Sequence, residues 1–261
     1  MHFFISILII HIGLTYNSVE KIRKEDLMQN ILSYVRRAVE DYDMIQEGDR
    51  IAIGVSGGKD SLTLLKAMKG LQRFFPKNFE LEAITLTMGF DDFDLSGVQA
   101  LCDDIDVPYT IIPTNIAEVI FDIRKESNPC SLCAKMRRGA LHDAALERGC
   151  KKVALGHHFD DAIETFFMSL FYEGRINCFS PVTYLDRKDI HLIRPMLYVP
   201  EQIIKGFSNQ SALPIVQSPC PANGHTKRQY IKDLLTTLTK ENKGLKERLF
   251  GAIKRSGIND W

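Results

Sequence analysis

The chain has 261 residues, of which 45% are hydrophobic and 25% are charged, as in a globular enzyme with a substantial core. Its 33 basic and 33 acidic side chains cancel, which excludes a protein that binds nucleic acid through overall positive charge. The six cysteines are too few for a disulfide scaffold of this length and indicate a reducing compartment.

The N-terminal segment FFISILIIHIGL (3–14) is apolar, but it is too short to span a bilayer and no Lys or Arg precedes it. It also lacks the small-residue cleavage site of a secretory signal. We therefore expect residues 1–27 to be an apolar extension, or the product of a start codon placed too early, with Met28 as one candidate start. No membrane role is expected.

Downstream, an amphipathic helix is predicted from the spacing of Leu27, Ile31, Val35 and Val39. Buried strands are predicted at 50–55, 81–88, 109–113, 152–156 and 190–195. Helices are predicted at 59–73, 95–104, 134–149 and 160–174, from Pro200, and at 226–238 and 242–255. This alternation predicts an α/β fold with a doubly wound, mostly parallel sheet and helical N- and C-terminal extensions. Ligands in such folds bind beyond the carboxyl ends of the strands.

The stretch IGVSGGKDS (53–61) joins a predicted strand to a predicted helix, so free backbone N–H groups can face an anion there. It is not a Walker A loop, because Ile53 stands where the first glycine should be and Asp60 follows Lys59. A bare carboxylate at position 60 would repel phosphate. The pattern therefore predicts a phosphate loop in which Mg²⁺ bridges Asp60 and the phosphates.

SGGKDS (56–61) resembles the PP-loop of the ATP pyrophosphatases, and this resemblance implies cleavage of ATP between its α- and β-phosphates. ALGHHFDDAIETFF (154–167) is similar to the second nucleotide motif of those enzymes. Asp160 and Asp161 begin a predicted helix, where carboxylates suit the helix dipole and a metal. Alone, such acids are more often ordinary helix-starting residues. The pairing of the two motifs favours a functional role for Asp161 and leaves His157 and His158 open.

Cys130 and Cys133 form a Cys-x-x-Cys just before a predicted helix, and Cys220 lies between two prolines far along the chain. Two cysteines alone fit a metal or a redox disulfide equally well. A third favours a site built from separate loops, either a [4Fe–4S] cluster with one open iron or Cys₃His zinc with His225. The remaining cysteines are interpreted as packing residues: Cys102, Cys150 and Cys178.

Four segments, CSLCAKMRRGAL, GHHFDDAIETFFMSLFYEGRI, IRPMLY and CPANGHTKRQYIKDLL, resemble the tRNA 2-thiocytidine synthetase (TtcA-like) family. The resemblance covers most of residues 28–256. It implies a Rossmann-like PP-loop ATPase (HUP) domain at 28–220, with a basic helical C-terminal extension at 221–261 packed on it. It also implies ATP-dependent thiolation of cytidine 32 in the tRNA anticodon loop, with a [4Fe–4S] cluster on Cys130, Cys133 and Cys220. The cysteine fingers of the related thiouridine enzymes are absent from this sequence, as is a second cysteine close after Cys220.

The implied reaction adenylates the C2 oxygen of the base, and a sulfide then displaces AMP. The implied catalytic residues are Asp60, Asp161 and Arg137, with Asp60 and Asp161 as the Mg²⁺ ligands. The implied ATP ligands are Ser56, Gly57, Gly58, Lys59, Asp60, Ser61 and Gly156. Cations proposed to hold the tRNA backbone are Lys135, Arg138, Lys151, Lys152, Lys227 and Arg228.

The charge distribution bears on tRNA binding, because residues 221–261 carry nine bases against four acids and residues 81–129 carry ten acids against two bases. A basic tail suits an anionic macromolecule, although solvated helix faces explain it equally well. The expected partners are tRNA, a cysteine desulfurase or other sulfur donor, and a second copy in a homodimer, all in the cytoplasm. The alternatives are another target base such as 2-thiouridine, another nucleophile, and a non-catalytic nucleotide-binding Fe–S or zinc sensor.

Overall fold

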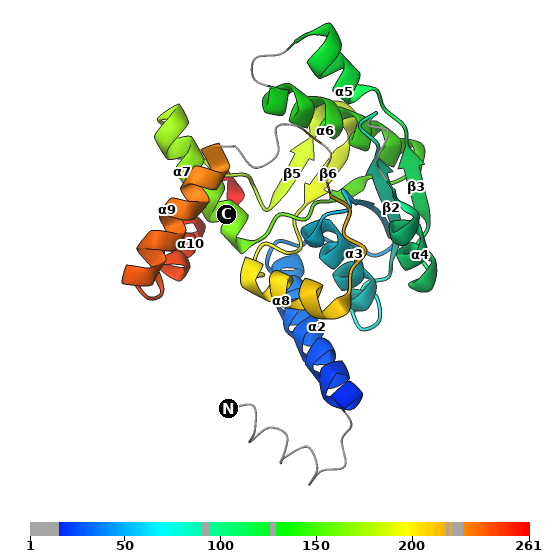
Figure 1. Cartoon of the computed structure of the whole chain (residues 1–261), viewed down its shortest axis with the longest axis horizontal. Helices are drawn as coiled ribbons and strands as arrows, with labels where there is room; N and C mark the ends of the chain where they lie inside the picture. Colours follow the sequence, from blue (N-terminus) through cyan, green and yellow to red (C-terminus); the bar gives the residue numbers. More distant parts are fainter. Residues whose placement is uncertain (1–15, 90–93, 126–128, 218–219, 221–226) are drawn as a thin grey trace.

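A six-stranded sheet forms the centre of the molecule (Figure 1). The computed structural model describes residues 16–89, 94–125, 129–217, 220 and 227–261. The strand order is β3-β2-β1-β4-β6-β5, and all neighbours are parallel except β5, which runs antiparallel to β6. The strands are β1 (Asp49–Gly54), β2 (Phe79–Leu86), β3 (Tyr109–Ile112), β4 (Lys152–Ala154), β5 (Val182–Leu185) and β6 (Ile190–Ile193).

Helices cover both faces of the sheet and form a further group at its side (Figure 1). On one face α2, α3 and α8 pack against one another, and α6 covers β2 and β4 on the other. Helices α7, α9 and α10 pack together beside the sheet. The helix bounds are α2 (Tyr16–Asp41), α3 (Lys59–Leu71), α4 (Ser96–Asp104), α5 (Ile116–Glu118), α6 (Pro129–Glu147), α7 (Phe159–Met168), α8 (Glu201–Ser211), α9 (Lys227–Glu241) and α10 (Leu245–Ser256). Short π-helical turns follow α5 (Val119–Ile123) and α7 (Ser169–Glu173), and 3-10 turns lie at Asp186–Lys188 and Ile258–Asp260.

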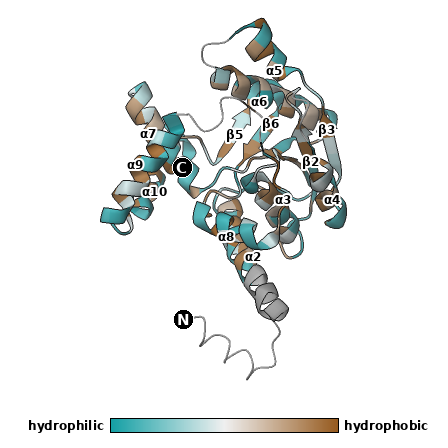
Figure 2. Cartoon of the chain, in the orientation of Figure 1, coloured by the Kyte–Doolittle hydropathy of each residue, from teal (hydrophilic) through white to brown (hydrophobic). Residues whose placement is uncertain are grey.

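The central strand β1 contributes to two hydrophobic cores, one on each face of the sheet. Ile51 and Ile53 are buried in the larger core beneath α2, α3 and α8, and Ala52 is buried in the smaller core beneath α6. This division follows from the period of two in a strand. In Figure 2 the helices carry both hydrophobic and hydrophilic residues, as amphipathic helices packed on a sheet do.

The predicted fold class is confirmed, and each predicted strand and helix is found. The largest shifts are at two helix starts: α2 begins at Tyr16, within the predicted extension 1–27, and α6 begins at Pro129, five residues before the predicted start. One expectation is wrong at the cysteines: α6 begins at Pro129, so Cys130 and Cys133 lie in its first turns rather than before it. The antiparallel edge strand β5 and the single-turn helix α5 were not predicted. In the described part of the chain, no helix has the length and apolar character needed to cross a bilayer.

The topological switch point lies between β1 and β4. From β1 the chain continues to β2 on one side, and β4 has β6 on its other side. The loops that leave β1 after Gly54 and β4 after Ala154 therefore emerge side by side at the carboxyl edge of the sheet. These loops carry the two predicted nucleotide motifs, at the position where α/β sheets bind ligands.

Candidate active site

The loop from Ser56 to Gly58 is held closed by Ser61. The backbone N–H of Ser56 donates to Ser61 Oγ at 3.1 Å, and that hydroxyl donates to the carbonyl oxygen of Gly58 at 3.0 Å. Gly57 has a φ of +78°, and a Cβ there would lie 2.9 Å from Val216 Cβ, so only glycine fits. No described side chain caps α3 at Gly58, which leaves the first N–H groups of the helix available to an anion.

The segment that leads to Cys220 crosses this loop. The backbone N–H of Val216 donates to the carbonyl oxygen of Gly57 at 3.0 Å. Pro214 lies against Gly97 of α4, where an added Cβ would be 2.8 Å from Pro214 Cβ. The phosphate loop and the approach to the third cysteine are therefore tied together by a backbone hydrogen bond.

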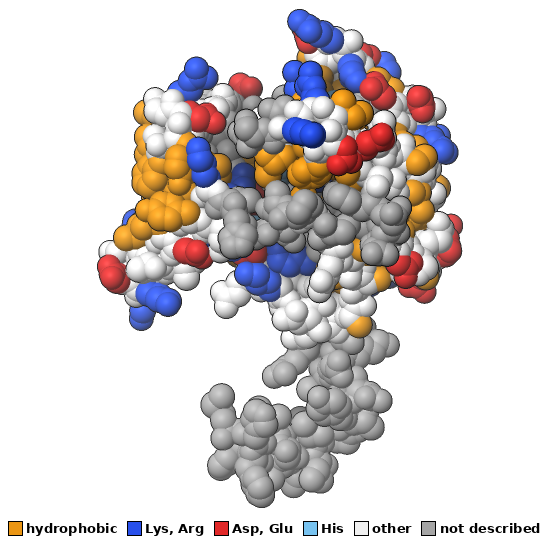
Figure 3. Space-filling model, turned by 45° about the horizontal axis from the view of Figure 1, so that its top comes forward, with side chains coloured by type: hydrophobic (Ala, Val, Ile, Leu, Met, Phe, Trp, Pro, Cys, Tyr) orange, Lys and Arg blue, Asp and Glu red, His pale blue; other side chains and the backbone are white. Residues whose placement is uncertain are grey.

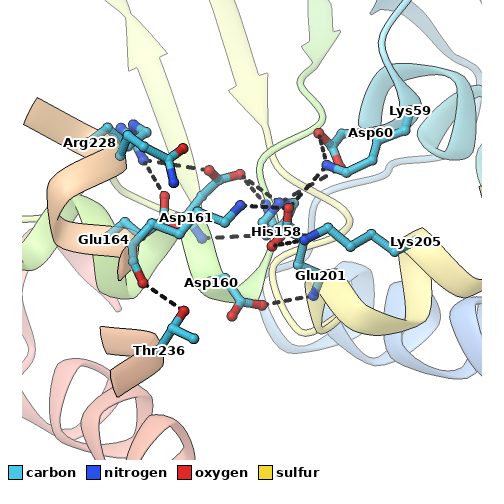
Figure 4. Close-up of polar contacts among 12 residues, drawn as sticks. Lys59, Asp60, His158, Asp160, Asp161, Glu164, Glu201, Lys205, Arg228 and Thr236 are labelled. Atoms are coloured by element: carbon cyan, nitrogen blue, oxygen red, sulfur yellow. Dashed lines mark hydrogen bonds and ion pairs between the residues drawn. The ribbon is translucent and has the colours of Figure 1, made fainter. Parts of the chain in front are cut away.

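Lys59 lies between two carboxylates (Figure 4). Its Nζ is 2.8 Å from Asp60 Oδ1 and 3.2 Å from Glu201 Oε1. Burial alone would lower the pKa of Lys59, but the hydrogen bond to Asp60 and the charges of Asp60 and Glu201 raise it above its ordinary value. The ammonium is therefore charged at neutral pH beside the loop.

The second motif converges on the same point from α7. His158 is the N-cap: Asp161 N donates to His158 Nδ1 at 3.4 Å, and His158 N donates to Asp161 Oδ2 at 3.1 Å. His158 Nε2 lies 3.4 Å from Asp161 Oδ2 and 3.7 Å from Asp60 Oδ1 (Figure 4). A Cβ on Gly156 would come within 3.3 Å of Ser61 N, so the absence of a side chain at Gly156 lets the two motifs pack closely. The two predicted Mg²⁺ carboxylates thus lie on either side of one buried imidazole.

Arg228 of α9 contacts the other side of Asp161. Its Nη1 is 3.5 Å from Asp161 Oδ1 and 3.3 Å from Glu164 Oε2, and its Nη2 donates to Thr165 Oγ1 at 3.2 Å. Burial and the charge of Asp161 raise the pKa of Glu164, which Arg228 partly offsets. Asp161 therefore contacts His158 with one oxygen and the guanidinium of Arg228 with the other.

The six cysteines differ in burial. Burial and the neighbouring thiols of Cys220 and Cys130 raise the pKa of Cys133, whereas Arg137, one turn further along α6, lowers it. These three thiols therefore lie near one another, and none of them is buried. The other three are buried, and burial raises their pKa values to about 11 (Cys102), about 11 (Cys150) and about 12 (Cys178).

Three cysteine thiolates are the ligand set of a [4Fe–4S] cluster with one open iron. Among the described residues, no three His, Cys, Asp or Glu side chains lie close enough to hold one metal ion. A [4Fe–4S] cluster takes each thiolate at a different iron, so its ligands need not converge on one point. His225, the candidate fourth zinc ligand, lies outside the described residues.

The six predicted tRNA-binding cations lie on α6, at the amino end of β4 and on α9. Lys135 and Arg138 are exposed on the N-terminal half of α6, near the cysteines, as is Arg137, the predicted catalytic residue. Lys227 lies 4.7 Å from the ring centre of Tyr172. Two others lie at the amino end of β4, at the opposite edge of the sheet: Lys151 contacts Asp189 at 2.6 Å and Lys152 contacts Asp49 at 2.6 Å. The structure does not bring Lys151 and Lys152 to the site, and it places Arg228 against acids.

Sequence reasoning missed two acids of this network, Glu201 and Glu164. Glu201 follows Pro200 at the start of a helix, where an acid is common for reasons of the helix dipole alone. Glu164 lies one turn beyond Asp160 and Asp161 in the motif but gave no separate signal. Only the packing of α8 and α9 beside α3 and α7 reveals their partners.

Residues 26–238 match the model of a family described as PP-loop domain. The chain is 37% identical over 228 residues to the tRNA-cytidine(32) 2-sulfurtransferase of Geobacter sulfurreducens, covering 86% of this chain and 89% of the relative. It is 37% identical over 231 residues to the enzyme of that name from Teredinibacter turnerae, covering 88% and 76%. Among solved structures it resembles the U34-tRNA thiolase NcsA from Methanococcus maripaludis with its [4Fe-4S] cluster. The TM-score is 0.73 and the identity 25%, over 89% of this chain and 79% of that one.

Proposed function

The chain belongs to the PP-loop family and, within it, to the tRNA-cytidine(32) 2-sulfurtransferases, and we propose that it replaces the C2 oxygen of cytidine 32 in tRNA with sulfur, consuming ATP. The observation that carries this proposal is the junction of three features at one sheet edge. These are the phosphate loop, the carboxylates of Asp60 and Asp161, and the segment toward Cys220 that is bonded to Gly57.

The phosphate loop would bind the phosphates of ATP. The residues proposed for this are Ser56, Gly57, Gly58, Lys59 and Ser61, with Gly156 allowing the close approach of the second motif. The C2 oxygen of the base attacks the α-phosphate, and pyrophosphate leaves. The backbone N–H groups at the start of α3 and the ammonium of Lys59 stabilise the negative charge that develops on the phosphates. Mg²⁺, held by Asp60 and Asp161, would neutralise further phosphate charge.

The adenylated C2 is then open to a sulfur nucleophile, which forms the C–S bond while the oxygen leaves with AMP. A [4Fe–4S] cluster on Cys130, Cys133 and Cys220 would supply an open iron to which sulfur can bind. The base must leave its stack to reach this edge, as bases in single-stranded RNA loops can. Arg137, close to Cys133, would face the phosphates, with Lys135 and Arg138 toward the tRNA backbone.

The first test is the nucleoside content of bulk tRNA from a strain that lacks this chain. We expect 2-thiocytidine to disappear from this strain and to return when the wild-type chain is supplied, because this chain is proposed to be the enzyme that adds sulfur to C2 of cytidine 32. Mass spectrometry of digested tRNA measures it. Loss of 2-thiouridine in place of 2-thiocytidine would correct the base, and unchanged thionucleosides would contradict the proposed function.

The sulfur donor is proposed to be a cysteine desulfurase or an equivalent persulfide carrier, in the cytoplasm where tRNA is modified. A homodimer is proposed on an apolar surface formed by the π-helical turn after α7 (Ser169–Glu173) and the residues that follow it. Figure 3 shows hydrophobic side chains gathered on this side of the molecule. Its members include Leu170 (39% exposed), Phe171 (49%), Tyr172 (41%) and Ile176 (68%).

Light scattering of the purified protein tests the dimer. The wild-type chain is expected at twice the monomer mass, and the double substitution Phe171→Glu with Ile176→Glu at the monomer mass, because two charges would be buried in the contact. The matched control is Phe74→Glu, an exposed aromatic elsewhere, which should leave the mass unchanged. A monomeric wild type would contradict the dimer.

A further inference from the structure

Glu201 is a buried carboxylate that belongs to neither nucleotide motif. It is 7% exposed, it begins α8, and its backbone N–H donates to Asp160 Oδ2 at 2.7 Å. Burial alone would raise its pKa, but hydrogen bonds from Lys232 and Lys205 and the charges of Lys232 and Lys59 lower the pKa to about 2. Glu201 is therefore negatively charged at neutral pH although it is buried.

The two oxygens of Glu201 have different partners (Figure 4). Oε1 lies 3.2 Å from Lys59 Nζ of the phosphate loop and 2.7 Å from Lys232 Nζ of α9. Oε2 lies 3.1 Å from Lys205 Nζ, one turn along α8, where the lysine side chain is 52% exposed. Lys59 is only 26% exposed, so its contact is shielded from solvent more than that of Lys205.

Asp60, the other carboxylate on Lys59, is proposed above to bind Mg²⁺. When it does so, Glu201 is the acid that stays beside Lys59. A lysine side chain is long and flexible, and a fixed anion beside its ammonium keeps it near the phosphates. We propose that Glu201 is a positioning residue that holds Lys59 ready to bind the phosphates of ATP. This inference rests on the proposed ATP-dependent function.

A double-mutant cycle tests this role without catalysis. Calorimetry measures the Kd of the full-length protein for a Mg²⁺-bound, non-hydrolysable ATP analogue, without tRNA. Glu201→Gln is expected to weaken binding about tenfold in the wild-type background, the size of one lost charge-assisted hydrogen bond. In a Lys59→Met background the same change should weaken binding less than about twofold, because the residue it positions is gone.

The matched control is Lys205→Met, which removes a cation from Oε2 and leaves Oε1 beside Lys59. It should change Kd less than about twofold. Should Glu201→Gln fail to fold, Glu201→Asp keeps the charge on a shorter side chain. Its expected loss is about threefold in the wild-type background and none with Lys59→Met.

Equal losses of nucleotide affinity in the wild-type and Lys59→Met backgrounds would overturn the positioning role. A general structural defect weakens binding by the same factor whether or not Lys59 is present. A wild-type chain that binds no nucleotide would overturn this role together with the ATP site. A cycle that behaves as expected while tRNA thionucleosides are unaffected in the deletion strain would support the role of Glu201 and contradict the proposed substrate.

Discussion

Replacing Asp161 with asparagine is expected to lower the rate of ATP-dependent sulfur transfer by about 10²–10³-fold while leaving the protein folded. Asparagine can still accept the backbone N–H of His158 through its side-chain oxygen, so the N-terminal cap of α7 is kept. The charge proposed to hold Mg²⁺ against the phosphates is lost. Arg228 retains Glu164 as a partner, which limits the structural damage.

Pyrophosphate release in the presence of unmodified tRNA measures this effect. The matched control is Asp189→Asn, which removes a carboxylate paired with Lys151 at the opposite edge of the sheet. Asp189 has a φ of +48°, a left-handed conformation that asparagine tolerates well, so the control should fold and retain activity within about twofold. Normal turnover by the Asp161→Asn variant would contradict a catalytic role for Asp161 and leave it only its structural role in the N-terminal cap of α7.

The two nucleotide motifs were predictable because each is local. Gly57 and Asp60 lie within one strand-loop-helix segment, and the order of strands and helices alone predicts that this loop opens at a switch point. The convergence of Asp60 and Asp161 near His158 follows from the adjacency of β1 and β4. A parallel sheet thus turns two separate sequence motifs into one site.

Contacts between helices far apart in the chain were not predictable. The sequence predicts Arg228 to be a surface cation in a basic segment. In the structure it contacts Asp161 and Glu164, because α9 packs on α7. Lys152 differs from Arg228, because the predicted strand at 152–156 already places Lys152 at the amino edge of the sheet, where it pairs with Asp49. Periodicity indicates which face of a helix is buried, but it does not indicate which partner covers that face.

Replacing Cys133 with serine is expected to abolish 2-thiocytidine formation while Mg²⁺-nucleotide binding stays within about twofold of wild type. A serine hydroxyl does not replace a thiolate at iron, because soft sulfur ligands are what Fe–S clusters require. The phosphate loop lies on β1 and α3 and depends on no cysteine for its hydrogen bonds. The substitution changes a single atom of a side chain that is not buried in the core, so the fold should be retained.

Cys102→Ser is the matched control, since it makes the same chemical change at a thiol that is fully buried in α4. Burying a hydroxyl there should cost about 1–3 kcal/mol of stability and leave tRNA thiolation intact. Nucleoside mass spectrometry, iron content after anaerobic purification and thermal unfolding separate the two variants. A cluster ligand at Cys133 predicts loss of thiolation with unchanged stability. A packing residue at Cys102 predicts loss of stability with unchanged thiolation. Thiolation that survives Cys133→Ser would contradict the three-cysteine cluster but would not bear on the proposed ATP site.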